Sequence, residues 1–275
     1  MSTDTVGTKM LVAERLRRFD TIGIDCVAMN ANDIVCVGAE PIAMLDFVLC
    51  GEADPGVFAQ LGAGLARGAE LAGIEITGGE VAQVGEIVTG LELGGTCVGT
   101  VALDAIVDGS RIEPGDPVIG LPSSGLHSNG YTLARRALAD VPLDDERLGR
   151  PLGDVLLEPT EIYVRAALDL LRAPVDVRAL AHVTGGGLRN LLRLGDHVGF
   201  EIDDPLPVPP IFALTRDLGA VSDEEMHEVF NMGCGFCCVV AAADEDAALG
   251  LLRARYPGAK RIGSATAEAG SLKRL

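Results

Sequence analysis

Lysine is scarce in this sequence. Only three of its 22 basic residues are lysine, and the formal net charge of the 275-residue chain is −18. Such an acidic chain repels polyanions, so nucleic acid and anionic membrane surfaces are not expected as partners. If the ligand carries phosphate, Mg²⁺ and backbone N–H groups must overcome the negative field locally.

Long apolar runs are also missing, although 48% of the residues are hydrophobic. No stretch approaches the roughly 18 consecutive apolar residues of a transmembrane helix. The start, MSTDTVGTKM, has no charged segment followed by an apolar block, as a signal peptide would. We therefore expect a cytoplasmic globular protein with a sizeable core.

An even set of cysteines is absent as well. The chain has seven cysteines at scattered positions, which is not typical of a disulfide framework. The run CGFCC contains one CxxC pair, Cys234 and Cys237, without a second pair at the spacing of zinc ligands. Because the run continues into VVAAA, we favour a buried strand over a metal or redox site.

The order of the predicted elements indicates an α+β protein with two domains. Helices are expected at 10–18, from residue 22 onward and after Pro55, and strands at 42–50, 74–77, 87–93 and 96–103. The segment DGSRIEPGDP, residues 108–117, combines Gly, Pro and charge and is the best boundary. We therefore expect an N-terminal domain at 1–109 and a C-terminal domain at 110–275, the latter with a mixed sheet flanked by helices.

Residues 22–41, IGIDCVAMNANDIVCVGAEP, form an apolar helix with polar residues on its apolar stripe. Helical periodicity places Asp25 and Asn32 about 20° apart and Asp33 about 80° from Asp25. A carboxylate buried without a partner costs several kcal/mol, so each needs donors, a cation or a ligand that carries a metal. Two interpretations remain open at this point: Asp33 satisfies nearby backbone while Asp25 is half exposed, or the carboxylates face a metal-bound ligand.

Two polar segments of the first half could contact such a ligand. STDTVGTK places Asp4 before a turn, with Thr8 and Lys9 available to a phosphate. GGE places Glu80 at a strand end after two glycines, and Asp46 lies in the middle of an apolar strand. Mg²⁺ prefers a few carboxylates together with ligand phosphates, which these residues can supply.

Two glycine turns of the second half, SSGLHSNG (123–130) and TGGG (184–187), each follow a strand and open a helix. Free N–H groups at a helix start can bind an anion, although a single turn of this kind is usually plain connection. Each turn has a histidine beside it, His127 and His182. A lone histidine is more often structural, but two such pairs in one half favour an anion site.

Taken in order, the motifs resemble the phosphoribosylformylglycinamidine cyclo-ligase family, also called aminoimidazole ribonucleotide synthetase. The matching segments are DTVGTK, DTIGIDCVAMNANDIVCVGAEP, GGE, DGSRIEPGD, SSGLHSNGYTLARR, PTEIYV, AHVTGGGLRN and FNMGCGF. The resemblance implies a two-domain fold whose N-terminal strands form a barrel with those of a second subunit at a homodimer interface. It also implies ATP- and Mg²⁺-dependent closure of the imidazole ring in purine biosynthesis.

The resemblance also implies roles for individual residues. It places His182, Lys9 and Asp33 in catalysis, with His182 transferring a proton. Residues expected to hold ATP are Asp4, Thr8, Lys9, Asp25, Asn32, Asp46 and Glu80. Residues expected to hold Mg²⁺ are Asp4, Asp33 and Glu80. Residues expected to bind the ribonucleotide are Ser124, His127, Ser128, Asn129, Thr184, Gly185, Gly186 and Gly187.

Two other hypotheses are kept. The first is another ATP-using enzyme of the same fold: thiamine-monophosphate kinase, selenophosphate synthetase or the hydrogenase-maturation protein. The PTEIYV and FNMG segments argue against all three. The second is a catalytically silent dimer, because members of the family normally carry several dozen residues, with a glycine-rich segment that closes over ATP, before the TD strand at which this sequence begins.

Overall fold

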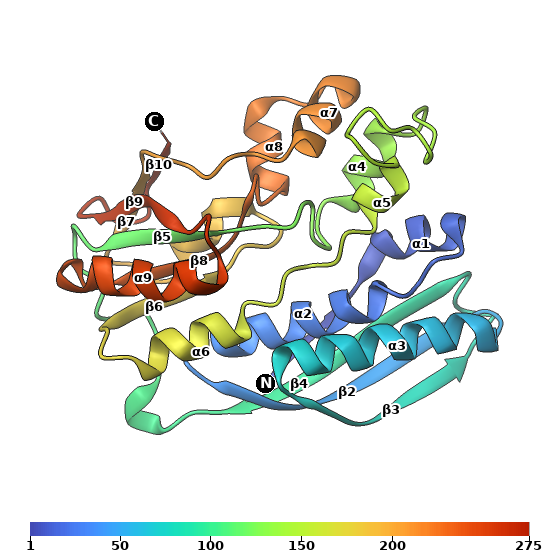
Figure 1. Ribbon diagram of the computed structural model, residues 1–275, viewed down its shortest axis with the longest axis horizontal. Coiled ribbons are helices and arrows are strands. Elements are labelled where there is room, and N and C mark those ends of the chain that lie inside the picture. The colour runs from blue at the N-terminus through green and yellow to red at the C-terminus, as the bar shows by residue number, and fades with distance from the viewer. Residues whose placement is uncertain (275) are drawn as a thin grey trace.

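The computed structural model describes residues 1–274, whose strands form two sheets (Figure 1). The first sheet has the order β1-β4-β2-β3. Its strands are β1 (Ser2–Thr5), β2 (Glu40–Cys50), β3 (Glu75–Gln83) and β4 (Leu91–Thr100). β3 is parallel to β2, and β4 is antiparallel to β1 and β2. The two strands expected at 87–93 and 96–103 are one strand, because residues 84–90 form the turn before it.

Helices cover one face of this sheet. They are η1 (Gly7–Lys9), α1 (Met10–Leu16), α2 (Ile22–Val35) and α3 (Pro55–Ala72). Figure 1 shows α2 and α3 side by side on the same side of the strands. The two helices approach so closely that a Cβ at Gly23 would lie only 2.1 Å from the backbone nitrogen of Leu65, so glycine is needed at this position. The other face of the sheet has no helix against it in the described part of the chain.

The second sheet has the order β10-β7-β9-β5-β8-β6. Its strands are β5 (Pro117–Pro122), β6 (Val177–His182), β7 (Gly199–Ile202), β8 (Cys234–Val240), β9 (Lys260–Thr266) and β10 (Leu272–Arg274). The helical segments of this half are α4 (Tyr131–Ala137), α5 (Leu152–Leu156), α6 (Val164–Arg172), η3 (Gly187–Arg193), α7 (Pro210–Gly219), α8 (Asp223–Val229), η4 (Ala242–Asp244) and α9 (Glu245–Arg255). The short turn η2 (Leu103–Ala105) follows β4. The expected α+β class with mixed sheets is confirmed.

Helix α2 joins the two halves. Its Cys26 belongs to a core cluster that also contains Leu126 and Phe230 of the second half. Its Val35 belongs to another cluster, with Ile119 of β5 and residues of β6, β8, α6 and α9. Apolar burial on two sides therefore fixes α2 between the sheets. This position is what brings polar residues of α2 to the second half.

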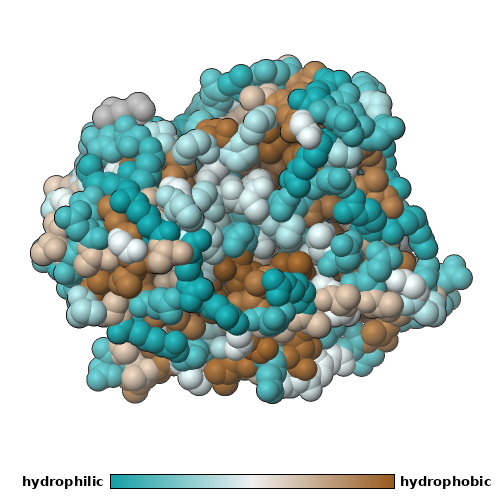
Figure 2. Space-filling model, viewed as in Figure 1, coloured by the Kyte–Doolittle hydropathy of each residue, from teal (hydrophilic) through white to brown (hydrophobic). Residues whose placement is uncertain are grey.

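The cysteine-rich segment is a buried strand, as predicted. Cys234, Cys237 and Cys238 are 3%, 0% and 0% exposed on β8. Within residues 1–274, no helix has the length and apolarity needed to cross a bilayer. Figure 2 shows a mainly hydrophilic face on which hydrophobic residues appear as separate patches, in keeping with the strong acidic charge.

Candidate active site

The candidate site begins where α2 meets the end of β6. Asp33 lies on α2 with 44% of its side chain exposed, and its Oδ1 is 2.9 Å from Nδ1 of His182, whose side chain is 2% exposed. The Nε2 atom of His182 is 3.4 Å from Nδ2 of Asn32. Because a carboxylate only accepts, Nδ1 of a neutral His182 carries the hydrogen and Nε2 is the acceptor. The contact with Asp33 therefore favours the tautomer of His182 in which Nε2 is the nitrogen that can accept a proton.

Asn32 is fully buried and acts as a clamp on the segment PTEIYV (159–164). Its Oδ1 accepts from the backbone N–H of Tyr163 at 2.8 Å, and its Nδ2 donates to the carbonyl of Glu161 at 2.9 Å. These bonds satisfy the amide within the protein. This arrangement uses both atoms of the Asn32 amide to position backbone beside His182, whereas the family resemblance implied a contact with a nucleotide.

Lys9 and Asp25 form a buried ion pair. Both side chains are 0% exposed, and Nζ of Lys9 is 2.8 Å from Oδ2 of Asp25. Nζ also donates to the carbonyl of Glu158 at 2.6 Å, while Thr160 donates to Asp25 from both its N–H and its hydroxyl at 2.7 Å. Burial lowers the pKa of Lys9, and the charge of Asp25 opposes that shift. Neither side chain is directed at open space, in contrast to the predicted role in holding ATP.

Two of the other predicted carboxylates share one face of the first sheet. Asp4 and Asp46 both pair with Gly95 of β4, on opposite sides of it, so their side chains point the same way, toward α2. A Cβ at Gly79, the partner of Asp46 on β3, would lie 2.7 Å from the Asp46 carboxylate. Burial raises the pKa of Asp4, and the charge of Asp33 raises it further. Burial also raises the pKa of Asp46.

Glu80 does not join this group. It pairs with Phe47, the neighbour of Asp46, and successive residues of a strand point to opposite faces. Its side chain therefore lies on the face that no helix covers. Within residues 1–274, no three His, Cys, Asp or Glu side chains come together as a metal site. The predicted set of Asp4, Asp33 and Glu80 is thus not assembled by one chain.

Asp4 and Asp33 nevertheless fit a hard divalent cation. After burial, the charge of Asp33 is a further cause that raises the pKa of Asp4, and a cation between the two would offset that repulsion. Oxygen ligands of this kind, few in number, suit Mg²⁺ when ligand phosphates supply the remaining positions. The exposed hydroxyl of Thr8 lies on the neighbouring turn, 3.2 Å from that of Thr132.

The two glycine turns come together in space. A Cβ at Gly185 would lie 3.5 Å from Oδ1 of Asn129, so the turns touch. Gly187 has φ +55°, and a Cβ there would lie 2.6 Å from the carbonyl of Phe230, so only glycine fits. TGGG opens the seven-residue 3-10 helix η3 rather than an α-helix, which corrects the sequence-based expectation.

The turn 123–130 is held by the segment that α2 clamps. The Ser124 hydroxyl donates to the carbonyl of Pro159 at 2.6 Å, and the Ser128 hydroxyl is 2.9 Å from that of Thr160. His127 is buried with φ +61°, and its Nε2 accepts from the N–H of Ser124 at 3.3 Å. Burial lowers the pKa of His127 well below its usual range. Its Nδ1 is buried and has no hydrogen-bond partner in the described part of the chain.

Three structural residues of the site were not predicted. Thr160 satisfies Asp25, and Tyr163 N–H is held by Asn32. Asn231 holds the beginning of the first turn, because its Nδ2 donates to the carbonyl of Gly125 and its Oδ1 accepts from the Ser123 hydroxyl, each at 2.9 Å. PTEIYV and FNMG were recognised as motifs, but a motif alone does not show which groups its side chains meet.

Comparisons with known proteins agree along the whole chain. The AIR synthase related protein N-terminal domain matches residues 1–101, and the corresponding C-terminal domain matches residues 113–273. The phosphoribosylformylglycinamidine cyclo-ligase of Thermococcus gammatolerans is 50% identical over 98% of this chain and 80% of its own length.

Solved structures share the fold at much lower identity. Thiamine-monophosphate kinase from Stenotrophomonas maltophilia has a TM-score of 0.71 at 22% identity, covering 99% of this chain and 84% of its own. The hydrogenase maturation protein HypE in complex with ATP has a TM-score of 0.68 at 21% identity, covering 92% of this chain and 75% of its own. At this identity they show the fold alone. The chain belongs to the phosphoribosylformylglycinamidine cyclo-ligase family.

Proposed function

We propose that the protein catalyses the ATP-dependent closure of formylglycinamidine ribonucleotide to 5-aminoimidazole ribonucleotide, a step of purine biosynthesis. The observation that carries this proposal is the Asp33–His182 contact, which joins α2 to the second half in a chain 50% identical to a named cyclo-ligase. The low-identity kinase and HypE structures supply no comparable support for their own activities.

In this reaction the formyl oxygen of the substrate takes the γ-phosphoryl group of ATP. An amidine nitrogen then attacks the formyl carbon, loses a proton, and expels the oxygen as phosphate. Activation is needed because an unphosphorylated formamide oxygen is a poor leaving group. His182 is the proposed acceptor of that proton, because Asp33 holds its Nδ1–H and Nε2, 3.4 Å from the Asn32 amide nitrogen, is then the acceptor nitrogen of the ring. Proton transfer to a positioned base is typically worth about 10²–10⁴ in rate.

Asp4 and Asp33 are the proposed ligands of Mg²⁺, with Asp46 on the same side of the sheet and Thr8 close to the phosphates. When bound, Mg²⁺ neutralises charge that develops on the transferring phosphoryl group. We assign Lys9, Asp25 and Asn32 to positioning instead. Their bonds to residues 158–163 hold that segment under the turn 123–130.

The ribonucleotide phosphate is proposed to bind where the two glycine turns touch. Both turns supply backbone N–H groups, and Ser124, Ser128 and Asn129 surround the contact. The buried Nδ1–H of His127, which lacks an acceptor in residues 1–274, is a further donor toward bound substrate. Thr184, Gly185, Gly186 and Gly187 supply the second turn.

The uncovered face of the first sheet supports a homodimer. Leu45 is 53% exposed on this face, beside the half-buried Phe47, and a sheet face of this kind is usually covered. A second copy laid on it would close the two open sheets toward a barrel and would bring its Glu80 to the partner's surface. The division into domains at 1–109 and 110–275 is a separate part of the proposal.

The test is a coupled assay on the full chain with formylglycinamidine ribonucleotide, with and without ATP and Mg²⁺. Turnover is expected only when all three are present. Asp33→Asn is expected to lower kcat at least about hundredfold with unchanged thermal unfolding, because Asp33 is half exposed. Asp140→Asn, an exposed carboxylate that is not among the residues proposed for the site, is the matched control.

Two results would contradict the proposal. One is full turnover of Asp33→Asn. The other is phosphorylation of thiamine monophosphate by ATP in place of ring closure, which would favour the kinase hypothesis. A folded dimer with neither activity would match the silent-dimer hypothesis.

A further inference from the structure

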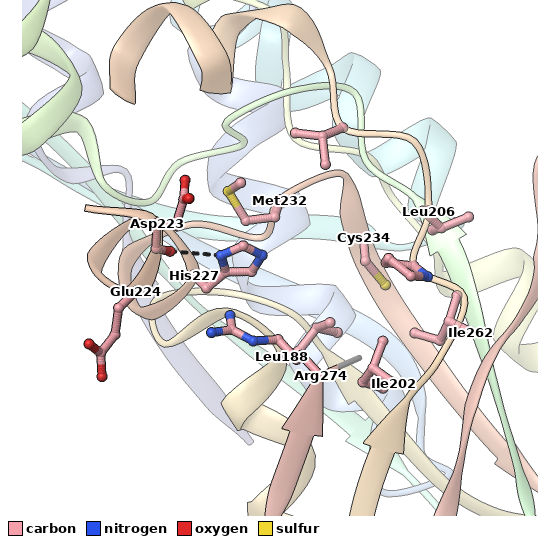
Figure 3. A pocket seen from close by; sticks show the side chains of 12 residues that line it. Leu188, Ile202, Leu206, Asp223, Glu224, His227, Met232, Cys234, Ile262 and Arg274 are labelled. Atoms are coloured by element: carbon pink, nitrogen blue, oxygen red, sulfur yellow. Dashed lines mark hydrogen bonds between the residues drawn. The ribbon is translucent and has the colours of Figure 1, made fainter. Parts of the chain in front are cut away.

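A cavity of about 400 Å³ lies in the second half, outside the site described above (Figure 3). It is bounded by α8, the loop between β7 and α7, and strands β7 and β9. Its wall is apolar at one end, where Ile202, Leu206 and Ile262 face inward. This end offers an apolar body a place out of water.

The other end of the cavity carries the guanidinium of Arg274. Figure 3 shows the Arg274 guanidinium and the His227 imidazole facing each other across it. Arg274 has no carboxylate within ion-pair distance among residues 1–274, whereas most arginines of this acidic chain have one. Nδ1 of His227 donates to the carbonyl of Asp223 at 2.8 Å, so its Nε2 is an acceptor, and Arg274 is the group that can hold an anion.

Acidic residues at the rim limit the charge of an occupant. Asp223 is paired with Arg216, but Glu224 forms no ion pair within the described residues. One negative group can be matched by Arg274, and a second would face Glu224. We infer that the cavity binds a small monoanion with an aromatic or branched apolar body, its charged group on the Arg274 guanidinium.

The cavity shares residues with the proposed substrate turns. Leu188, which lines it, directly follows Gly187, and Met232 lies between Asn231 and Gly233 with φ +48°. Asn231 in turn holds Ser123 and the carbonyl of Gly125. An occupant would therefore press on the outer side of both turns. This coupling rests on the proposed function, whereas binding itself does not.

The test uses 1-anilinonaphthalene-8-sulfonate, a fluorescent aromatic monoanion, titrated into the full chain without substrate. One saturable site per chain is expected. Arg274→Gln should weaken binding about tenfold, the loss of one charge-assisted contact, and Arg274→Lys should restore part of it. Val208→Asp, at a half-exposed position of the rim, should also weaken binding. Arg136→Gln, at an exposed arginine that has no ion pair among residues 1–274, is the matched control and should change nothing.

Equal binding by wild type, Arg274→Gln and Val208→Asp would overturn the inference, because the probe would then sit elsewhere. Displacement of the probe by inorganic phosphate alone would also overturn it, since the apolar end would then be irrelevant. If ring closure is observed, the probe should change KM for the ribonucleotide in wild type and not in Arg274→Gln. Loss of ring closure altogether, with probe binding intact, would count only against the proposed function.

Discussion

Replacing Lys9 by methionine tests whether this residue stabilises the fold or binds a nucleotide. Methionine keeps the unbranched stem but removes the ammonium, which leaves Asp25 buried with only the two donors of Thr160. Removing one partner of a buried ion pair costs about 3–5 kcal/mol. Because Thr160 still satisfies one carboxylate oxygen, we expect about 3 kcal/mol, the lower end of that range.

The measurement is urea unfolding at pH 7 without nucleotide, for wild type, Lys9→Met, Asp25→Asn and the double variant. The double variant should recover at least about 1 kcal/mol relative to the sum of the single changes, since neither charge is then left alone. A different result would refute this reasoning: Lys9→Met unfolding within about 0.5 kcal/mol of wild type while losing ATP affinity. Lys9 would then be a nucleotide ligand, as the family resemblance first implied.

Further predictions concern packing, the carboxylates and the dimer. Gly235→Ala should destabilise by about 3 kcal/mol in thermal unfolding, because its Cβ would lie 2.0 Å from the Tyr163 hydroxyl; Gly62→Ala on α3, with nothing within 4 Å, should be neutral or stabilising. Asp4→Asn should raise Tm without Mg²⁺ and abolish any rise in Tm on adding Mg²⁺. The folded protein raises the pKa of Asp4, so the stability that protonated Asp4 contributes is lost as the pH rises from the ordinary pKa of the carboxyl through its pKa in the folded protein. Asparagine cannot ionise and therefore avoids this loss at neutral pH. Leu45→Lys should shift the protein from dimer to monomer in sedimentation; an unchanged dimer would place the interface elsewhere.

Local signals predicted much of the fold. The start of α3 could be predicted from Asp54, whose side chain accepts from the first free N–H groups of the helix, and from Pro55, which has no N–H. The end of α3 could be predicted from Gly73, which has φ +75°. The polar stripe of α2 was likewise readable from helical periodicity. Its partners were not, because Thr160 and Glu158 lie more than 100 residues away and meet Asp25 and Lys9 only through tertiary packing. Periodicity shows that a buried carboxylate needs a partner but does not say which one.

Glu80 shows why the metal set could not be assembled from the sequence. The family resemblance grouped Asp4, Asp33 and Glu80 as ligands of Mg²⁺, without showing which face of the sheet Glu80 occupies. Which face each carboxylate takes depends on register, and β2 pairs with β3 through a bulge between Met44 and Leu45. A shift of one residue reverses every side chain of a strand, so this bulge fixes Glu80 opposite Phe47, on the other face of the sheet from the Asp46 side chain. If Glu80 contributes to a magnesium site at all, the contribution must therefore go to a second chain laid on the open face, and mixing Glu80→Gln with Asp33→Asn chains should restore part of the activity that each variant lacks alone.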